Sequence, residues 1–163
     1  MDDFTLEPAS SEQIAQLWRD FSGLPVVTVS RTYQAADAGA AEALVYRDEG
    51  GKTAGHVTWS VDGETGEIVT IEAVEQGRHI GGRLLEAAEA RMRERGVGRI
   101  VVTTTNDNLR AQAFYMRRGY RLARIERDGM KRVREVKSRV PATGYEGLPL
   151  LDMWEFEKEI GQR

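Results

Sequence analysis

No cysteine occurs among the 163 residues of this chain. This absence excludes structural disulfides, thiolate metal sites and a cysteine nucleophile. It is compatible with the cytoplasm, where we expect the protein to reside. The chain also lacks an uninterrupted apolar run of about 18 residues, so we expect no membrane span. The acidic start at residues 1–4 has no apolar segment of the kind that a secretory signal peptide needs.

Histidine and net positive charge are also scarce. The two histidines, His56 and His79, have no metal-ligand spacing, so we expect no metal site. The net charge of −3 gives no electrostatic reason to expect a nucleic-acid partner. Apolar residues make up 40% of the chain and charged residues 30%, which is typical of a globular protein. Residues 1–163 therefore predict a single domain with one core.

The hydrophobic pattern predicts strands first and then strands that alternate with helices. Ser10 and Gln13 have capping-box spacing, and the helix they begin ends before Gly23. Residues 26–30 favour a strand, whereas residues 34–41 fit either helix or loop. The further expected strands are 4–7, 43–47, 53–61, 67–74, 100–102, 120–125 and 152–158, and the further helices are 84–95, 108–118 and 128–137. This order predicts a mixed α/β (α+β) fold with helices on the faces of a sheet.

A glycine-rich turn, Gln76 through Leu85, joins an apolar strand to an amphipathic helix. Such a turn exposes main-chain N–H groups at the positive end of the helix dipole, where a phosphate or pyrophosphate can bind. Arg78 and Arg83 add positive charge. An ordinary turn is the alternative, since glycines serve many turns. The segment is neither a P-loop nor a dinucleotide-binding turn, because the required lysine and glycine spacings are missing.

Two motifs carry a resemblance to a known family. Gln76-x-x-His79-x-Gly81 resembles the Gln/Arg-x-x-Gly-x-Gly/Ala signature of the GNAT superfamily of N-acetyltransferases. Asn108-x-x-Ala111-x-x-Phe114-Tyr115-x-x-x-Gly119-Tyr120 resembles the second signature of that superfamily. The resemblance extends over residues 66–125 and departs at His79, where the family usually has glycine.

The resemblance implies a GNAT-like domain that uses acetyl-CoA. Its sheet is expected to have about seven mostly antiparallel strands, twisted, with helices on both faces. The fourth and fifth strands are expected to splay apart around the pantetheine arm, at residues 71–74 and 101–104. The main-chain N–H of Val74 is then expected to polarise the thioester carbonyl. The implied cofactor-binding residues are Val74, Gln76, Gly77, Arg78, His79, Ile80, Gly81, Gly82, Arg83, Asn108, Ala111 and Tyr115.

The implied reaction is direct attack of an amine on the thioester. Tyr115 occupies the general-acid position of the family, although a core aromatic is the alternative. Glu72 is the favoured base, and it could instead be a solvated strand residue. Glu67 is the second candidate, but five residues separate the two glutamates, which places them on opposite faces of a regular strand. Only one of them can then easily face the cleft, unless a bulge intervenes. The family arrangement also makes Trp18 and Tyr33 candidates for the acceptor pocket.

The expected acceptor is a primary amine, on a small molecule or on a peptide. A homodimer is possible, since it is the commonest assembly for such domains. A non-catalytic acyl-CoA-binding sensor is the rival interpretation. A nucleic-acid-binding regulator is disfavoured by the negative net charge.

Overall fold

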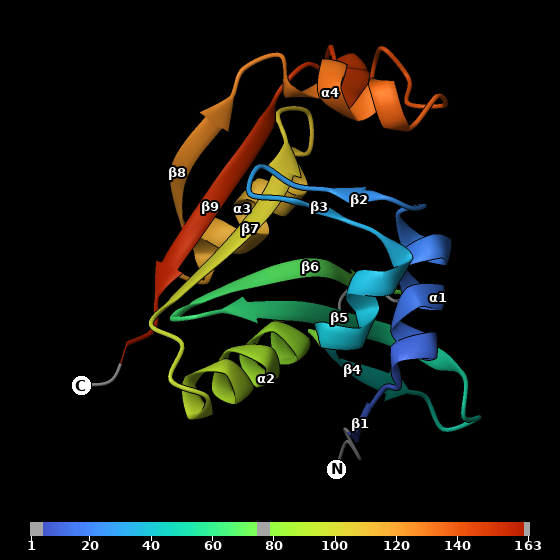
Figure 1. Cartoon of the computed structure of the whole chain (residues 1–163), viewed down its shortest axis with the longest axis vertical. Coiled ribbons are helices and arrows are strands. Elements are labelled where there is room, and N and C mark those ends of the chain that lie inside the picture. Colours follow the sequence, from blue (N-terminus) through green and yellow to red (C-terminus); the bar gives the residue numbers. More distant parts are fainter. Residues whose placement is uncertain (1–4, 75–78, 162–163) are drawn as a thin grey trace.

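The computed structural model describes residues 5–74 and 79–161. Its main sheet has seven strands in the order β1-β4-β5-β6-β7-β9-β8 (Figure 1). Of the neighbouring pairs in this sheet, β6 and β7 alone are parallel, and the others are antiparallel. The strands are β1 (Leu6–Pro8), β4 (Glu42–Arg47), β5 (Thr53–Asp62), β6 (Thr65–Ala73), β7 (Arg99–Thr105), β8 (Arg121–Glu126) and β9 (Met153–Glu159). The predicted mixed α/β fold with a mostly antiparallel sheet is confirmed.

Four helices and a short hairpin accompany the sheet. The helices are α1 (Ser11–Phe21), α2 (Ile80–Glu94), α3 (Leu109–Arg117) and α4 (Gly129–Val136). The hairpin consists of β2 (Val26–Val27) and β3 (Thr32–Tyr33). The segment whose structure the sequence left open forms a 3-10 helix, Ala35–Ala40. None of the helices in the described part of the chain is long and apolar enough to cross a membrane.

Local sequence signals explain where the helices begin and end. The predicted capping box at α1 is present, because Ser10 and Gln13 bond reciprocally to each other's main-chain N–H groups. After α2, Gly96 has a φ of 84°, a left-handed conformation that glycine adopts without steric cost. Asp128 also precedes a helix, but its side chain makes no capping bond there.

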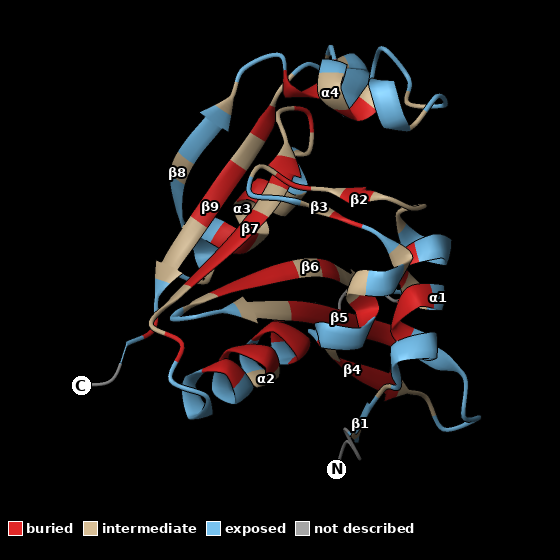
Figure 2. Cartoon of the chain, in the orientation of Figure 1, coloured by how far each residue is buried: buried red, intermediate tan, exposed pale blue. Residues whose placement is uncertain are grey.

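The core is divided between the two faces of the sheet. On one face α2 packs against β4, β5 and β6, and its buried side chains include Leu84, Leu85 and Met92. On the other face α1 contributes Ile14 and Trp18 to a second cluster, which also contains Tyr33. Figure 2 shows the buried sides of α1 and α2 turned toward the strands. Helices therefore cover both faces, as the sequence predicts.

The sheet opens in its middle. The ladder between β6 and β7 runs from Thr65↔Arg99 to Ile68↔Val102 and stops there. At the same level the β5–β6 register shifts, with Thr58↔Thr70 followed by Trp59↔Ile68, so Val69 is an extra residue in β6. A bulge of this kind bends a strand and increases its twist. It marks the place where β6 leaves β7 (Figure 1), and the predicted splay is confirmed.

The bulge corrects one expectation from the sequence. Glu67 pairs with Ser60, and Glu72 pairs with His56. Ser60 and His56 are four residues apart on β5, so both point to the same face. The two glutamates therefore share the face that α1 covers. A regular strand would have placed them on opposite faces, and the extra residue Val69 brings them to the same one.

Candidate active site

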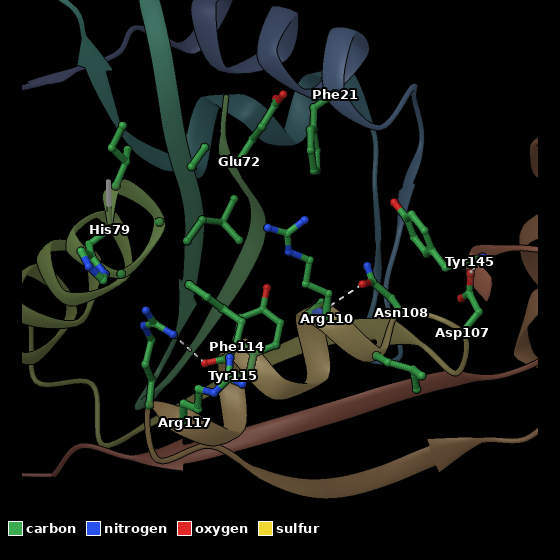
Figure 3. Close-up of a pocket in the computed structure, with 18 of the residues that line it drawn as sticks. Phe21, Glu72, His79, Asp107, Asn108, Arg110, Phe114, Tyr115, Arg117 and Tyr145 are labelled. Carbon is green, nitrogen blue, oxygen red and sulfur yellow. Dashed lines mark hydrogen bonds between the residues drawn. The ribbon is translucent and has the colours of Figure 1, made fainter. Parts of the chain in front are cut away.

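A cleft of about 1070 Å³ lies at the opening in the sheet (Figure 3). Its walls are the last residues of β6, the N-terminus of α2, the helix α3 and the loop before β9. The lining residues are Phe21, Ile71, Glu72, Ala73, His79, Ile80, Gly81, Gly82, Asp107, Asn108, Leu109, Arg110, Ala111, Phe114, Tyr115, Arg117, Arg118, Tyr145, Glu146 and Leu148. Eight of the predicted site residues are among them: Glu72, His79, Ile80, Gly81, Gly82, Asn108, Ala111 and Tyr115.

The N-terminus of α2 presents main-chain donors at one end of this cleft. The N–H of Arg83 bonds to the carbonyl of His79, as the first main-chain bond of the helix. The N–H groups of residues 80–82 therefore have no partner within the helix. His79 stands before the helix with a φ of 58° and makes no side-chain capping bond. This left-handed conformation is uncommon for a residue with a side chain, although histidine is among the enriched types. Here the family signature has glycine.

Glycines at the start of α2 leave room for the side chains of Arg118 and Phe114. A β-carbon on Gly82 would lie 2.8 Å from Nη2 of Arg118, and one on Gly81 would lie 3.3 Å from the ring of Phe114. The Arg118 guanidinium rests 3.9 Å from the centre of the Phe114 ring and donates to the Phe114 carbonyl. A fixed positive charge thus stands beside the free N–H groups. The sequence analysis missed Arg118, although its basic type and its place before Gly119 could have indicated it.

Besides Val74, four predicted cofactor residues are not among the lining residues. Gln76, Gly77 and Arg78 lie outside the described residues. Arg83 is described, but its N–H belongs to the helix and its side chain is exposed and outside the lining. The expectation that Arg83 adds positive charge beside the turn stays a prediction.

The start of α3 forms the second wall. Asn108 caps this helix, because its Oδ1 accepts from the N–H of Ala111 at 3.0 Å. The nearby carboxylate of Asp107 is buried and accepts from the N–H of Tyr145 at 3.0 Å. This bond fixes the loop that carries Tyr145, Glu146 and Leu148 over the cleft. Residues 141–149 contain two prolines and two glycines, a composition that indicates a loop but does not identify these lining residues.

Tyr115 combines a buried ring with a hydroxyl directed into the cleft (Figure 3). The ring packs edge-on against Phe114 and Tyr120, with centroids 5.3 and 5.7 Å away. Burial raises the pKa of its phenol above the ordinary value, so the hydroxyl keeps its proton at neutral pH. Within the described residues this hydroxyl has no hydrogen-bond partner. It is placed to donate a proton to a bound group.

The main-chain donor predicted at Val74 is used elsewhere. Its N–H donates to the carbonyl of Ala54 at 2.9 Å, so that prediction is wrong. Because N–H groups in an antiparallel ladder alternate between the two sides of a strand, those of Ile71 and Ala73 point away from β5. They face the opening toward β7, where the β6–β7 ladder has ended. Ala73 therefore replaces Val74 as the donor that the geometry favours.

Glu72 carries a partly exposed carboxylate into the cleft from β6 (Figure 3). Its Oε2 lies 3.9 Å from Nδ1 of His56, its cross-strand neighbour. Phe21, from the end of α1, packs edge-on against His56 and also lines the cleft. No separate signal in the sequence marks Phe21, because its spacing on α1 matches that of the buried Ile14 and Trp18.

The two residues predicted to line an acceptor pocket are buried instead. Trp18 is 0% exposed, and its indole N–H donates to Oγ1 of Thr58 at 2.9 Å. Tyr33 is 1% exposed, and its hydroxyl donates to Oε1 of Glu67 at 2.6 Å. Neither lines the cleft. Their large rings fill the space between α1, the β2–β3 hairpin and the sheet, and Phe21 is the aromatic residue of α1 that lines the cleft.

Glu67, the second candidate base, is buried beneath Tyr33 and lies outside the cleft lining. Its other oxygen, Oε2, has no hydrogen-bond partner among the described residues. Burial raises the pKa of Glu67 to about 7, and the charge of Glu155 acts in the same direction. The hydroxyls of Tyr33 and Thr28 and the charge of Arg31 partly oppose this rise.

The raised pKa predicts a stability that depends on pH. Between pH 4.5 and about 7 the unfolded chain gives up this proton while the folded chain keeps it, so stability falls as pH rises. Glu67→Gln removes this titration. Relative to the wild type, the free energy of unfolding of the variant should rise by about 2 kcal/mol between pH 5 and pH 8. Urea unfolding at the two pH values measures this, with the exposed Glu49→Gln as control. If the free energies of unfolding of Glu67→Gln and the wild type differed by the same amount at both pH values, the raised pKa of Glu67 would be contradicted.

Among residues 5–74 and 79–161, no set of three or more histidine, aspartate or glutamate side chains is arranged to hold a metal ion. The cleft combines main-chain donors, the Arg118 guanidinium stacked on a ring, the Tyr115 phenol and the Glu72 carboxylate. These groups suit the binding of an anionic ligand at one end and proton transfer at the other.

Comparisons with known proteins place this geometry in a family. A model described as the acetyltransferase (GNAT) family matches residues 11–120. YxbD of Bacillus subtilis (strain 168), an uncharacterized protein, is 36% identical over 106 residues, which are 65% of this chain and 67% of that protein.

Two solved structures share the fold. An IAA acetyltransferase from Bacillus cereus ATCC 14579 has a TM-score of 0.76 at 23% identity, covering 97% of this chain and 100% of that chain. A GNAT family acetyltransferase from Elizabethkingia anophelis, solved with acetyl-CoA bound, has a TM-score of 0.75 at 19% identity, covering 98% and 100%. The family match spans more than half of the sequence and both predicted signatures as far as Tyr120. The chain belongs to the acetyltransferase (GNAT) family.

Proposed function

We propose that the protein transfers an acetyl group from acetyl-CoA to the primary amine of a small molecule. One observation carries the proposal: a single cleft joins free main-chain donors at a helix N-terminus to a protonated phenol and an accessible carboxylate. Direct attack of the amine on the thioester requires only that both substrates be held together. It needs no enzyme nucleophile, in keeping with the lack of cysteine.

The start of α2 supports the binding of acetyl-CoA. The N–H groups of residues 80–82 point out of the helix, Gly81 and Gly82 add no side chain, and Arg118 stands beside them. These groups suit a pyrophosphate. The relative from Elizabethkingia anophelis was solved with acetyl-CoA bound. When bound here, acetyl-CoA would supply the activated acetyl carbon.

The opening between β6 and β7 supports the placement of the reacting atoms. The N–H of Ala73 faces this opening and would stabilise charge that develops on the thioester oxygen. Tyr115 would give its proton to the departing sulfur. Glu72 would take a proton from the incoming ammonium, since only the neutral amine can attack.

The acceptor end of the cleft favours an amine with an apolar body. Phe21, Ile71 and Leu148 line the cleft together with the carboxylate of Glu72. A carboxylate attracts the ammonium form of the amine, and the apolar side chains favour a hydrocarbon or aromatic portion.

Release of free CoA thiol in the presence of a panel of amines tests the proposed function. We expect release with at least one primary amine of apolar body and less with short polar amines. Acetyl-CoA at about 100 times its Kd should raise the Tm by about 5 to 10 °C. If the enzyme acetylated peptides and not small amines, the acceptor would be a polypeptide. No thiol release and no Tm shift at millimolar acetyl-CoA would refute the proposal.

A further inference from the structure

A row of polar side chains runs from α1 to the cleft along the face of β5 and β6 that α1 covers. Trp18 Nε1 lies 2.9 Å from Thr58 Oγ1, and Thr58 Oγ1 lies 2.7 Å from Thr70 Oγ1. Thr70 Oγ1 in turn lies 3.0 Å from His56 Nε2. On the other side of the ring, His56 Nδ1 lies 3.9 Å from Glu72 Oε2. Of these five residues, only Glu72 reaches the cleft.

The direction of the hydrogen bonds follows from the donors around Thr58. Its Oγ1 accepts from the indole N–H of Trp18 and from the main-chain N–H of Thr70. A hydroxyl has two acceptor positions and one hydrogen. Because both acceptor positions are used, the hydroxyl of Thr58 donates to Oγ1 of Thr70.

The same count favours one tautomer of His56. If Thr70 Oγ1 accepted from both Thr58 and a protonated Nε2 of His56, its own buried hydrogen would be left without an acceptor among these partners. All hydrogens are paired when the Thr70 hydroxyl instead donates to Nε2 of His56. A neutral imidazole that accepts at Nε2 carries its hydrogen on Nδ1. The Glu72 carboxylate selects the same tautomer, because a negative oxygen attracts an N–H and repels a nitrogen lone pair. Both sides of the ring therefore agree on the Nδ1–H form.

The surroundings of His56 keep the ring neutral and fixed. The residue is 2% exposed, and burial lowers its pKa to about 4. Phe21 covers the ring edge-on, with centroids 5.5 Å apart. Glu72 is the one charged side chain among its described partners. A neutral N–H at this place attracts the carboxylate without competing with an ammonium ion for its charge.

We propose that His56 is a positioning residue for deprotonation of the acceptor amine, which orients Glu72 through its Nδ1–H. The inference rests on the proposed function, in which Glu72 is the base. At 3.9 Å the contact is longer than a hydrogen bond, so the Glu72 oxygens keep their capacity to accept from an amine. Thr70, Thr58 and Trp18 act indirectly, because their hydrogen bonds select the tautomer of His56.

Nitrogen NMR of the wild-type protein tests the tautomer without any assay of activity. The chain has two histidines, so a His79→Gln variant assigns the ring signals by removing one set. We expect a protonated, pyrrole-type signal from Nδ1 of His56 and an unprotonated, pyridine-type signal from Nε2. The reverse pattern, or a charged ring at pH 7, would overturn the inference. This result stands whether or not an acetyl acceptor is found.

Two matched substitutions test the effect on catalysis. The amide nitrogen of asparagine can replace Nδ1, whereas that of glutamine reaches the position of Nε2. We therefore expect His56→Gln to lower kcat roughly tenfold, as loss of an orienting partner does at other sites. We expect His56→Asn to retain most of kcat, and KM for acetyl-CoA to stay unchanged in both. Equal losses of kcat in the two variants would overturn the inference.

A double-mutant cycle separates positioning from mere stability. If His56 acts through Glu72, His56→Gln should cause no further loss in a Glu72→Gln background. An additive loss would overturn the inference. Thr70→Val removes the donor to Nε2 and should shift the His56 signals toward the other tautomer, which provides a second variant if changes at His56 unfold the protein. Unchanged signals in Thr70→Val would count against the proposed hydrogen-bond direction. Absence of thiol release by the wild type, with the expected tautomer present, would refute the proposed function alone.

Discussion

Replacing Tyr115 by phenylalanine should lower kcat for acetyl transfer by about a hundredfold, the lower end of what a general acid contributes. The phenol is the protonated group that the structure directs into the cleft, and burial raises its pKa. Phenylalanine keeps the ring contacts with Phe114, Tyr120 and Phe156, so the fold should be preserved. Steady-state kinetics should show KM for acetyl-CoA unchanged within about twofold, because the lost interaction belongs to the transition state.

Tyr120→Phe provides the matched control for this experiment. Tyr120 belongs to the same aromatic cluster, but its hydroxyl donates to Oε2 of Glu89 at 2.8 Å, and the residue lies outside the cleft lining. Loss of this buried bond should lower thermal stability and leave kcat close to that of the wild type. If the two variants had the same kcat, Tyr115 would be a core aromatic without a part in proton transfer.

The second large effect is expected for Glu72→Gln, which should lower kcat/KM about a hundredfold near neutral pH. Without the carboxylate, the enzyme depends on the fraction of amine that is already neutral in solution. That fraction rises tenfold per pH unit below the pKa of the amine. The deficit of the variant should therefore shrink as pH rises and be smallest near the amine pKa. A pH profile of kcat/KM for both proteins measures this change.

Glu67→Gln is the appropriate comparison for the base. Glu67 shares a strand and a face with Glu72, but it is buried beneath Tyr33 and does not line the cleft. We expect its substitution to change stability and to leave the pH profile of kcat/KM in place. If Glu67→Gln changed the pH profile of kcat/KM and Glu72→Gln did not, Glu67 would be the base and Glu72 would not.

The sequence predicted the parts of the site that depend on local signals. The glycine-rich turn and the helix after Asn108 were found from short motifs, because glycine placement and capping are properties of neighbouring residues. His79, Ile80, Gly81, Gly82, Asn108, Ala111 and Tyr115 line one cleft, as the motifs implied. The capping box of α1 was also visible in the sequence.

Details that depend on strand register were not predicted. Whether Val74 or Ala73 offers a free N–H depends on which residue of β6 lies opposite Ala54. Whether Glu67 and Glu72 share a face depends on the extra residue Val69. One residue more or less in the ladder reverses both answers, because side chains and N–H groups alternate along a strand.

By itself, the sequence determined the order of strands and helices, the helix start that offers main-chain donors and the phenol that follows it. These features arise from contacts between residues close in the chain. Only the tertiary structure decided that Trp18 and Tyr33 are buried, that Phe21 and the loop around Tyr145 border the cleft, and that β9 lies between β7 and β8. Such outcomes depend on which distant segments compete for the same space. Side-chain volume and ladder register settle that competition after the elements have formed.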